Sequence, residues 1–147
     1  IQARKIRMMK RSQLQNLSSD IIPDDVRILL GNSMGEMFMY YAACDVAFIG
    51  GSLLKLGGQN LIEASALGKP VLIGPHTFNF EAITKDAISA GAAIRIQTAS
   101  EMMTEADKLF SQDTSRSEMG IKAQAFAQNQ HGATDRTMAL LAPLLEK

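Results

Sequence analysis

Cysteine, tryptophan and histidine are scarce in this sequence of 147 residues. It has one cysteine, no tryptophan and two histidines. The single cysteine, Cys44, excludes an internal disulfide and a zinc site made of several cysteines. His76 and His131 lie too far apart in the sequence to have the spacing of metal ligands. The sequence therefore predicts no metal site and no bound cofactor, and a reducing compartment such as the cytoplasm is expected.

Long apolar runs and an excess of charge of one sign are also absent. The apolar runs end well short of the ~18 residues that a transmembrane helix needs, and the basic start, residues 1–11, has no apolar segment typical of a signal peptide. Fifteen Lys and Arg residues balance fifteen Asp and Glu residues, which argues against a general nucleic-acid binder. With 46% apolar and 20% charged residues, a packed core is expected rather than disorder.

The length corresponds to about one domain, and no repeat, low-complexity tract or linker divides it. We therefore expect a single domain over residues 1–147. The sequence starts at Ile1 in what reads as the middle of a structure. We expect it to be truncated at its N-terminus and to belong to a larger protein.

Short apolar runs alternate with longer mixed segments along the chain. We expect strands over residues 4–10, 26–30, 46–49, 71–73 and 92–96, and helices over residues 33–43, 59–67, 79–90, 100–110, 117–128 and 134–145. The runs at 46–49 and 71–73 do not alternate with polar residues, which predicts burial on both faces of a parallel sheet. The sequence thus predicts an α/β fold, a Rossmann-like open parallel sheet with helices on both faces and a helical C-terminal tail.

Glycine-containing segments follow three of the expected strands, over residues 31–36, 50–60 and 74–80. In open parallel sheets, ligands bind outside the carboxyl ends of the strands, where these loops would meet. The central loop holds two glycine pairs, and the second pair opens an expected helix. Glycines let the backbone approach a ligand closely, and the amides at a helix start attract anions.

Lys55 adds a positive charge to the central loop, and Asn60 and Glu63 share the first turn of the helix that follows. A carboxylate such as that of Glu63 accepts hydrogen bonds from the two hydroxyls of a ribose, while the amides near Gly57 and Gly58 suit a phosphate. This division predicts a nucleotide site. In the alternative interpretation, Asn60 and Glu63 are a plain capping pair and the glycines form a tight turn.

The first loop also has two interpretations. Ser33 and Glu36 match the S-x-x-E capping box, which explains both residues without a ligand. Gly35 weakens a helix and would let a base or phosphate approach the backbone. Glu36 would repel a phosphate, so its expected role is a cap or a contact to a base or sugar. Arg11 ends the first expected strand, near the same crevice.

Four sequence elements within residues 31–80 carry a resemblance to a known family. They are M-G-E, A-F-x-G-G-S-L, G-G-x-N-x-x-E-A and G-P-H-T-x-N-F. Their order and spacing resemble those of the C-terminal domain of 3-deoxy-D-manno-octulosonic acid (Kdo) transferases. That family has the two-domain GT-B glycosyltransferase fold and transfers Kdo from CMP-Kdo to the lipid A precursor, lipid IVA, in lipopolysaccharide biosynthesis. Arg11-Ser12 and residues 131–137 are also similar to the family.

The resemblance implies that this chain is the donor-binding half of such an enzyme and binds CMP-Kdo or CMP. It places the phosphate at the start of the helix, the ribose at Glu63 and the first loop along the nucleotide pocket, with Arg11 and Lys55 as partners of the phosphate or the Kdo carboxylate. The expected substrate-binding residues are Arg11, Ser33, Met34, Gly35, Glu36, Lys55, Gly57, Gly58, Asn60 and Glu63.

The resemblance also implies what the chain lacks. The catalytic base, an acidic residue, and the acceptor site belong to the family's N-terminal domain, so we expect this chain to be soluble and inactive by itself. The full-length enzyme would carry out an inverting, metal-independent transfer at the cytoplasmic face of the inner membrane. Gln59 departs from the family, which often has His there. Two alternatives stay open: a GT-B enzyme or epimerase that uses a UDP-sugar, and a non-catalytic α/β binding module.

Overall fold

The computed structural model describes residues 4–14, 21–130, 138 and 141–143. The chain forms two compact units, Ile1–Tyr40 and Tyr41–Lys147. The single-domain organisation expected from the sequence remains a prediction. Within the described ranges, none of the helices combines the length and the apolar composition needed to cross a membrane.

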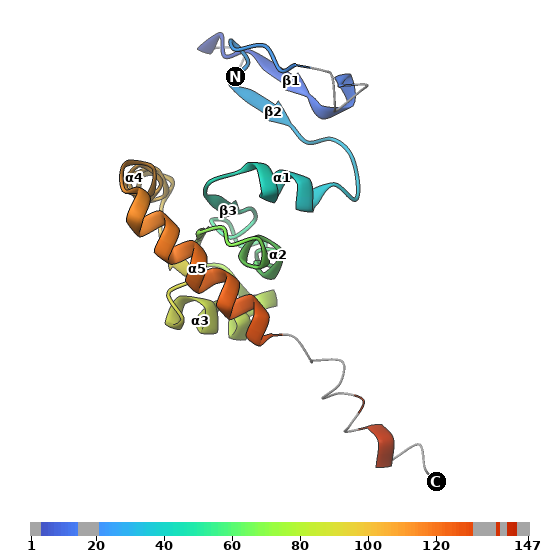
Figure 1. Cartoon of the computed structure of the whole chain (residues 1–147), viewed down its shortest axis with the longest axis vertical. Coiled ribbons are helices and arrows are strands. Elements are labelled where there is room, and N and C mark those ends of the chain that lie inside the picture. The colour runs from blue at the N-terminus through green and yellow to red at the C-terminus, as the bar shows by residue number, and fades with distance from the viewer. Residues whose placement is uncertain (1–3, 15–20, 131–137, 139–140, 144–147) are drawn as a thin grey trace. The chain divides into compact units, whose positions relative to one another are not determined.

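The first unit contains a small parallel sheet (Figure 1). Strand β1 (Met8–Lys10) pairs with β2 (Ile28–Leu30), with Met9 opposite Leu29. A 3-10 turn, Arg11–Gln13, follows β1 directly. The side chain of Asn32 joins the two strand ends, because it donates to the Ser12 hydroxyl (2.9 Å) and accepts from the Ser12 N–H (3.0 Å).

The second unit is built on a three-stranded parallel sheet in the order β3-β4-β5. Its strands are β3 (Ala47–Ile49), β4 (Val71–Ile73) and β5 (Ala93–Arg95). Helix α1 (Met37–Ala43) precedes this sheet and spans the boundary between the units. The other helices are α2 (Ile62–Ala66), α3 (Glu81–Ser89), α4 (Ala99–Ser111) and α5 (Asp113–Asn129), and a 3-10 turn covers Phe78–Phe80.

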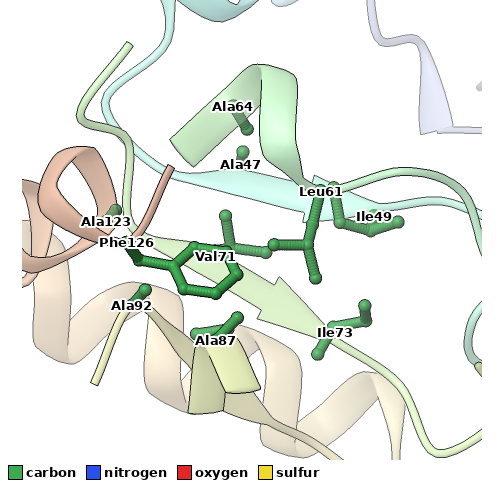
Figure 2. Packing of buried hydrophobic residues seen from close by; sticks show 11 residues of the cluster. Ala47, Ile49, Leu61, Ala64, Val71, Ile73, Ala87, Ala92, Ala123 and Phe126 are labelled. Atoms are coloured by element: carbon green, nitrogen blue, oxygen red, sulfur yellow. The ribbon is translucent and has the colours of Figure 1, made fainter. Parts of the chain in front are cut away.

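Both faces of the three-stranded sheet are packed against helices. On one face, the side chains of β3, β4 and β5 meet those of α2, α3 and α5 in a core of Ala47, Ile49, Leu61, Ala64, Val71, Ile73, Ala87, Ala92, Ala93, Ala123 and Phe126 (Figure 2). On the other face, Leu72 packs with Leu109 of α4 and Met119 of α5. This confirms the predicted α/β class, the parallel strands and the helices on both faces of this sheet.

The expected strands are present, but three of the predictions about them differ in detail. Four of the five strands are shorter than expected, β4 having the predicted bounds, and the strands belong to two sheets of two and three strands. All of β4 is buried, as predicted for residues 71–73, since β4 is the central strand. The same prediction is wrong for β3 at Phe48, whose exposed fraction is 39%. The reason is that β3 pairs only with β4 and lies at an edge of the sheet.

The helix starts are the other corrections. Helix α1 begins at Met37 rather than residue 33, because Gly35 has a φ of +77°, which is incompatible with a helix. Helix α2 begins at Ile62 rather than residue 59, and α5 begins at Asp113, before the expected residue 117. Most of the expected helix over 134–145 lies outside the described residues. Met138 and residues 141–143, which are described, are helical.

Candidate functional site

The candidate site of the second unit is formed by two loops at neighbouring strand ends. The glycine loop, residues 50–60, follows β3, and the 74–80 loop follows β4, its partner in the sheet. Gly51, Gly57 and Gly58 all have positive φ, at +72°, +89° and +73°. The N–H of Gly58 donates to the carbonyl of Gly51 (3.2 Å), so the two glycine pairs close the segment between them.

Gly57 and Gly58 are buried, and each needs glycine for its backbone conformation. At Gly57 a second constraint applies. A Cβ there would overlap the side-chain amide of Asn79 and lie 2.8 Å from the Phe78 ring. At Gly58 the nearest atom would be the carbonyl oxygen of His76, at an ordinary 3.5 Å. The 74–80 loop therefore packs directly against the glycine pair.

Ser52 joins the two loops through both its side chain and its backbone. Its hydroxyl donates to the carbonyl of Ile49 (2.5 Å) and accepts from the N–H of Gly74 (2.8 Å). Its carbonyl accepts from the N–H of His76 (2.9 Å). Sequence reasoning missed this residue. A signal for it exists, because a Ser just after a strand end typically bonds nearby backbone groups.

Arg95, at the end of β5, holds the other side of the 74–80 loop. Its Nη1 donates to the carbonyl of Gly74 (2.9 Å), and both Nη atoms lie 3.5 Å from the Thr77 hydroxyl. Gly74 has no room for a side chain, since a Cβ would overlap the Ser52 carbonyl oxygen and lie 2.6 Å from the Leu53 nitrogen. The carboxyl ends of all three strands of this sheet are thus linked around Gly74.

Asn60 and Glu63 differ in how they are used. The side-chain oxygen of Asn60 accepts from the N–H of Ile62 (2.9 Å), the first residue of α2, whose N-cap is Leu61. Glu63 is half-buried, and its carboxylate accepts no hydrogen bond from any residue that the structure describes. It lies near Tyr41, where burial raises the pKa of the phenol and the Glu63 charge raises it further. Asn60 is therefore bonded at the helix start without being its N-cap, and the capping interpretation does not account for Glu63.

The other predicted residues of this unit are at the surface. Lys55 and Gln59 are exposed. In the described part of the chain, no hydrogen bond or ion pair holds the Lys55 ammonium. The backbone N–H groups of Gln59, Asn60 and Leu61 likewise donate to no described residue, whereas the next N–H, of Ile62, is taken by Asn60.

In the first unit, Glu36 is the centre of a polar cluster. Its carboxylate accepts from Arg11 Nη2 (2.7 Å), from the Ser33 hydroxyl and from the Tyr40 hydroxyl (3.4 Å). The hydrogen bond from Ser33, aided by the positive charge of Arg11, holds the pKa of Glu36 below its usual value. Tyr40 in turn packs against Gly31, where a Cβ would lie 2.9 Å from the ring.

The predicted capping box of Ser33 and Glu36 is wrong. The carbonyl of Glu36 accepts from the N–H of Tyr40 (3.3 Å), so the first helical bond starts at Glu36 and not at Ser33. The Ser33 hydroxyl bonds the Glu36 carboxylate instead of a backbone N–H. The positive φ of Gly35 separates Ser33 from the helix.

The Arg11 side chain points into its unit, whereas two other predicted residues, Met34 and Gly35, are exposed. Its side chain is 13% exposed, and its second terminal nitrogen donates to the Leu14 carbonyl (2.9 Å). Met34 is 96% exposed, and the space beside Gly35 is open. Five predicted residues thus belong to the first unit, namely Arg11, Ser33, Met34, Gly35 and Glu36. The other five, Lys55, Gly57, Gly58, Asn60 and Glu63, belong to the second.

The described residues contain no group of three or more His, Cys, Asp or Glu side chains that could hold a metal ion. Cys44 is half-buried, its thiol contacts the Tyr41 carbonyl, and burial raises its pKa. A raised pKa favours an unreactive thiol. The candidate site of the second unit therefore offers a ligand backbone amides and single polar side chains.

Comparisons with known proteins identify relatives of this chain. No protein-family model matches the sequence. The chain is 49% identical over 116 residues to 3-deoxy-D-manno-octulosonic acid transferase of Bordetella pertussis, covering 79% of this chain and 27% of that protein. It is 32% identical over 144 residues to the Haemophilus influenzae protein of the same name, covering 95% of this chain and 34% of that protein.

One solved structure is also similar, the C-terminal CMP-Kdo binding domain of WaaA from Acinetobacter baumannii. It is 27% identical in sequence and superposes with a TM-score of 0.77, covering 86% of this chain and 64% of that one. The chain spans only about a quarter to a third of the length of the transferases it matches.

Proposed function

Because the chain belongs to the Kdo transferase family and corresponds to its C-terminal domain, we propose that it binds the nucleotide donor CMP-Kdo. The proposal extends to the protein as a whole. It is a glycosyltransferase that moves Kdo from CMP-Kdo to the lipid A precursor during lipopolysaccharide biosynthesis. The related Acinetobacter baumannii structure is a CMP-Kdo binding domain, which supports the same ligand here.

The observation that carries the proposal is the row of free amides beside the two left-handed glycines. The N–H groups of Gln59, Asn60 and Leu61 have no acceptor among the described residues, and they follow Gly57-Gly58 at the carboxyl edge of a parallel sheet. Such successive amides bind a phosphate, and ligands bind at this edge of open α/β sheets. Exposed Lys55 supplies the positive charge.

Glu63 suits the ribose in this proposal. Its carboxylate is half-buried, accepts no hydrogen bond from the described residues and lies within one turn of the free amides. A ribose diol offers two donors to such a group. Ser33, Met34, Gly35 and Glu36 are proposed for the base and sugar, and Arg11 for an anionic group of the donor. The Arg11 charge is already balanced by Glu36. We therefore propose that Arg11 contributes less than Lys55 to the binding of the donor's anionic groups.

The catalytic base and the acceptor site are proposed to lie in the rest of the protein. In the transfer, a hydroxyl of the acceptor attacks the anomeric carbon of Kdo as CMP leaves. The loop amides would then stabilise the negative charge that develops on the departing phosphate. We propose that this takes place at the cytoplasmic face of the inner membrane, with the membrane contact made by the full-length protein.

Calorimetric titration of the chain with CMP, with UMP and UDP as controls, tests the proposal. We expect CMP to bind more tightly than either uridine nucleotide. Tighter binding of UDP would assign the domain to a UDP-sugar enzyme. If no nucleotide binds the chain or the full-length protein, the glycine loops serve as turns only and the proposal fails.

A further inference from the structure

We infer that Ser52 is a positioning residue, which fixes the glycine loop against the 74–80 loop and thereby sets the backbone that the donor phosphate meets. The choice of ligand rests on the proposed function. The role of Ser52 as a clamp rests on its own contacts. Ser52 is completely buried, and no part of its side chain reaches the surface where a ligand would bind.

The hydroxyl of Ser52 does two things that a smaller or apolar side chain cannot do. It donates to the Ile49 carbonyl at the end of β3 and accepts from the Gly74 N–H at the end of β4. Only a group that both donates and accepts can link a carbonyl to an amide in this way. The backbone of Ser52 adds a third hydrogen bond, from the His76 N–H to its carbonyl.

Burial alone does not explain this pattern. Two other hydroxyls, those of Ser65 and Thr84, are completely buried as well, and neither has a hydrogen-bond partner in the described part of the chain. A buried hydroxyl in this protein therefore need not be bonded. The three hydrogen bonds of Ser52 are a local feature of the place where the two loops meet.

The clamp acts on the phosphate site through the backbone. Gly74 passes so close to Ser52 that a Cβ would overlap the Ser52 carbonyl. Because no side chain of residue 74 lies between the loops, the hydrogen bonds of Ser52 to Gly74 and His76 set their separation. The 74–80 loop then places Asn79 and Phe78 against Gly57, and the His76 carbonyl beside Gly58. Movement of that loop would displace the glycine pair and the free amides that follow it.

The test compares Ser52→Ala with Ser65→Ala, which removes an equally buried but unbonded hydroxyl. For each, CMP affinity is measured by calorimetry, the unfolding temperature by scanning calorimetry and the exchange of individual backbone amides by NMR without nucleotide. For Ser52→Ala we expect at least tenfold weaker CMP binding in a protein that is still folded at 25 °C. We also expect faster exchange at the Gly74 and His76 amides. For Ser65→Ala we expect affinity and exchange within twofold of the original chain.

CMP affinity of Ser52→Ala within twofold of the original, or unchanged exchange at Gly74 and His76, overturns the inference. If Ser52→Ala does not fold, Ser52→Cys takes its place, because a thiol still donates and accepts, but weakly. We expect it to show an intermediate loss, and full affinity would overturn the inference. If neither the original chain nor the full-length protein binds CMP, the proposed function fails, and amide exchange alone then decides whether Ser52 is the clamp.

Discussion

Arg11 and Glu36 are 25 positions apart in the sequence and form an ion pair, with Arg11 Nη2 2.7 Å from Glu36 Oε1. The pair joins the turn after β1 to the start of α1. It shows that a cation expected at the ligand crevice has an internal partner. A positive charge that is already paired contributes less to the binding of an anion than a free one.

The contacts of the Glu36 carboxylate, first the hydrogen bond from Ser33 and then the charge of Arg11, make the stability of the chain depend on pH. The pKa of Glu36 is held below its usual value of 4.5, so the ionised carboxylate stabilises the fold above that value. This contribution is lost as the pH falls through the lower pKa of the folded state. We expect the unfolding temperature to fall more steeply below pH 4.5 in the original chain than in Glu36→Gln.

Glu118→Gln serves as the control for this prediction, because no ion pair of Glu118 is present in the described residues and Glu118 is exposed. Its pH profile of unfolding should follow that of the original chain. Identical acid profiles for the original chain and Glu36→Gln would contradict a stabilising role of the Glu36 contacts.

Substitution of the loop glycines should follow their separate constraints. Gly57→Ala meets both the positive φ and the overlap with Asn79, whereas Gly58→Ala meets only the positive φ. A left-handed conformation costs a non-glycine residue about 1–2 kcal/mol. We therefore expect Gly58→Ala to lose about that much stability in urea unfolding, and Gly57→Ala to lose more and to bind CMP less well.

Gly50→Ala is the matched control in the same loop, since the space beside Gly50 is open and its φ is not positive. We expect its stability within about 0.5 kcal/mol of the original, as for most surface changes. Equal losses for Gly50 and Gly57 would mean that the loop does not have the described conformation in solution.

Replacement of Glu63 tests the ribose contact. We expect Glu63→Ala to weaken CMP binding by roughly 1–3 kcal/mol, the cost of leaving a polar partner unsatisfied. The fold should be little affected, because the Glu63 carboxylate makes no hydrogen bond to the described residues. Titration with CMP and with a dideoxy analogue that lacks both ribose hydroxyls measures the effect.

The analogue supplies the decisive comparison for Glu63. If the carboxylate binds the ribose, the substitution should weaken CMP binding and leave binding of the analogue nearly unchanged. An equal loss for both ligands would place Glu63 away from the hydroxyls. Glu118→Ala, on α5, controls for the removal of one negative charge from the domain.

The packing of α2 against α5 depends on a pair of glycines outside the candidate site. A Cβ at Gly120 of α5 would overlap the carbonyl oxygen of Gly68, just after α2. Alanine normally stabilises a helix relative to glycine by about 1 kcal/mol, but overpacking costs typically ~1–3 kcal/mol. We expect Gly120→Ala to lower the unfolding temperature, which thermal unfolding followed by circular dichroism measures.

Ser117→Ala, one turn earlier on the same helix, controls for changes in helix propensity, since Ser117 is exposed. It should leave the unfolding temperature unchanged or slightly raised. A stabilised Gly120→Ala would show that the two helices can separate enough to accept a methyl group.

Much of the second unit could be predicted because its signals are local. A run of three apolar residues between glycine or proline positions, as in Val71–Ile73, is sufficient to predict a buried strand. Gly68 ends α2 with a φ of +65°, as its place just after the apolar positions indicates. Helix starts were less predictable, because Gly35 precedes the first residue of α1, Met37, by only two positions and its left-handed φ depends on the surrounding fold.

The sequence by itself determined the α/β class, the order of the elements and the position of the glycine pairs, since each depends on near neighbours in the chain. Tertiary structure decided what polar side chains bond to. Ser33 matched a helix cap but bonds the Glu36 carboxylate. The Ser52 hydroxyl accepts from the N–H of Gly74, which lies 22 positions later, just after β4. A hydroxyl has several possible partners, and only the packing of distant segments selects one of them.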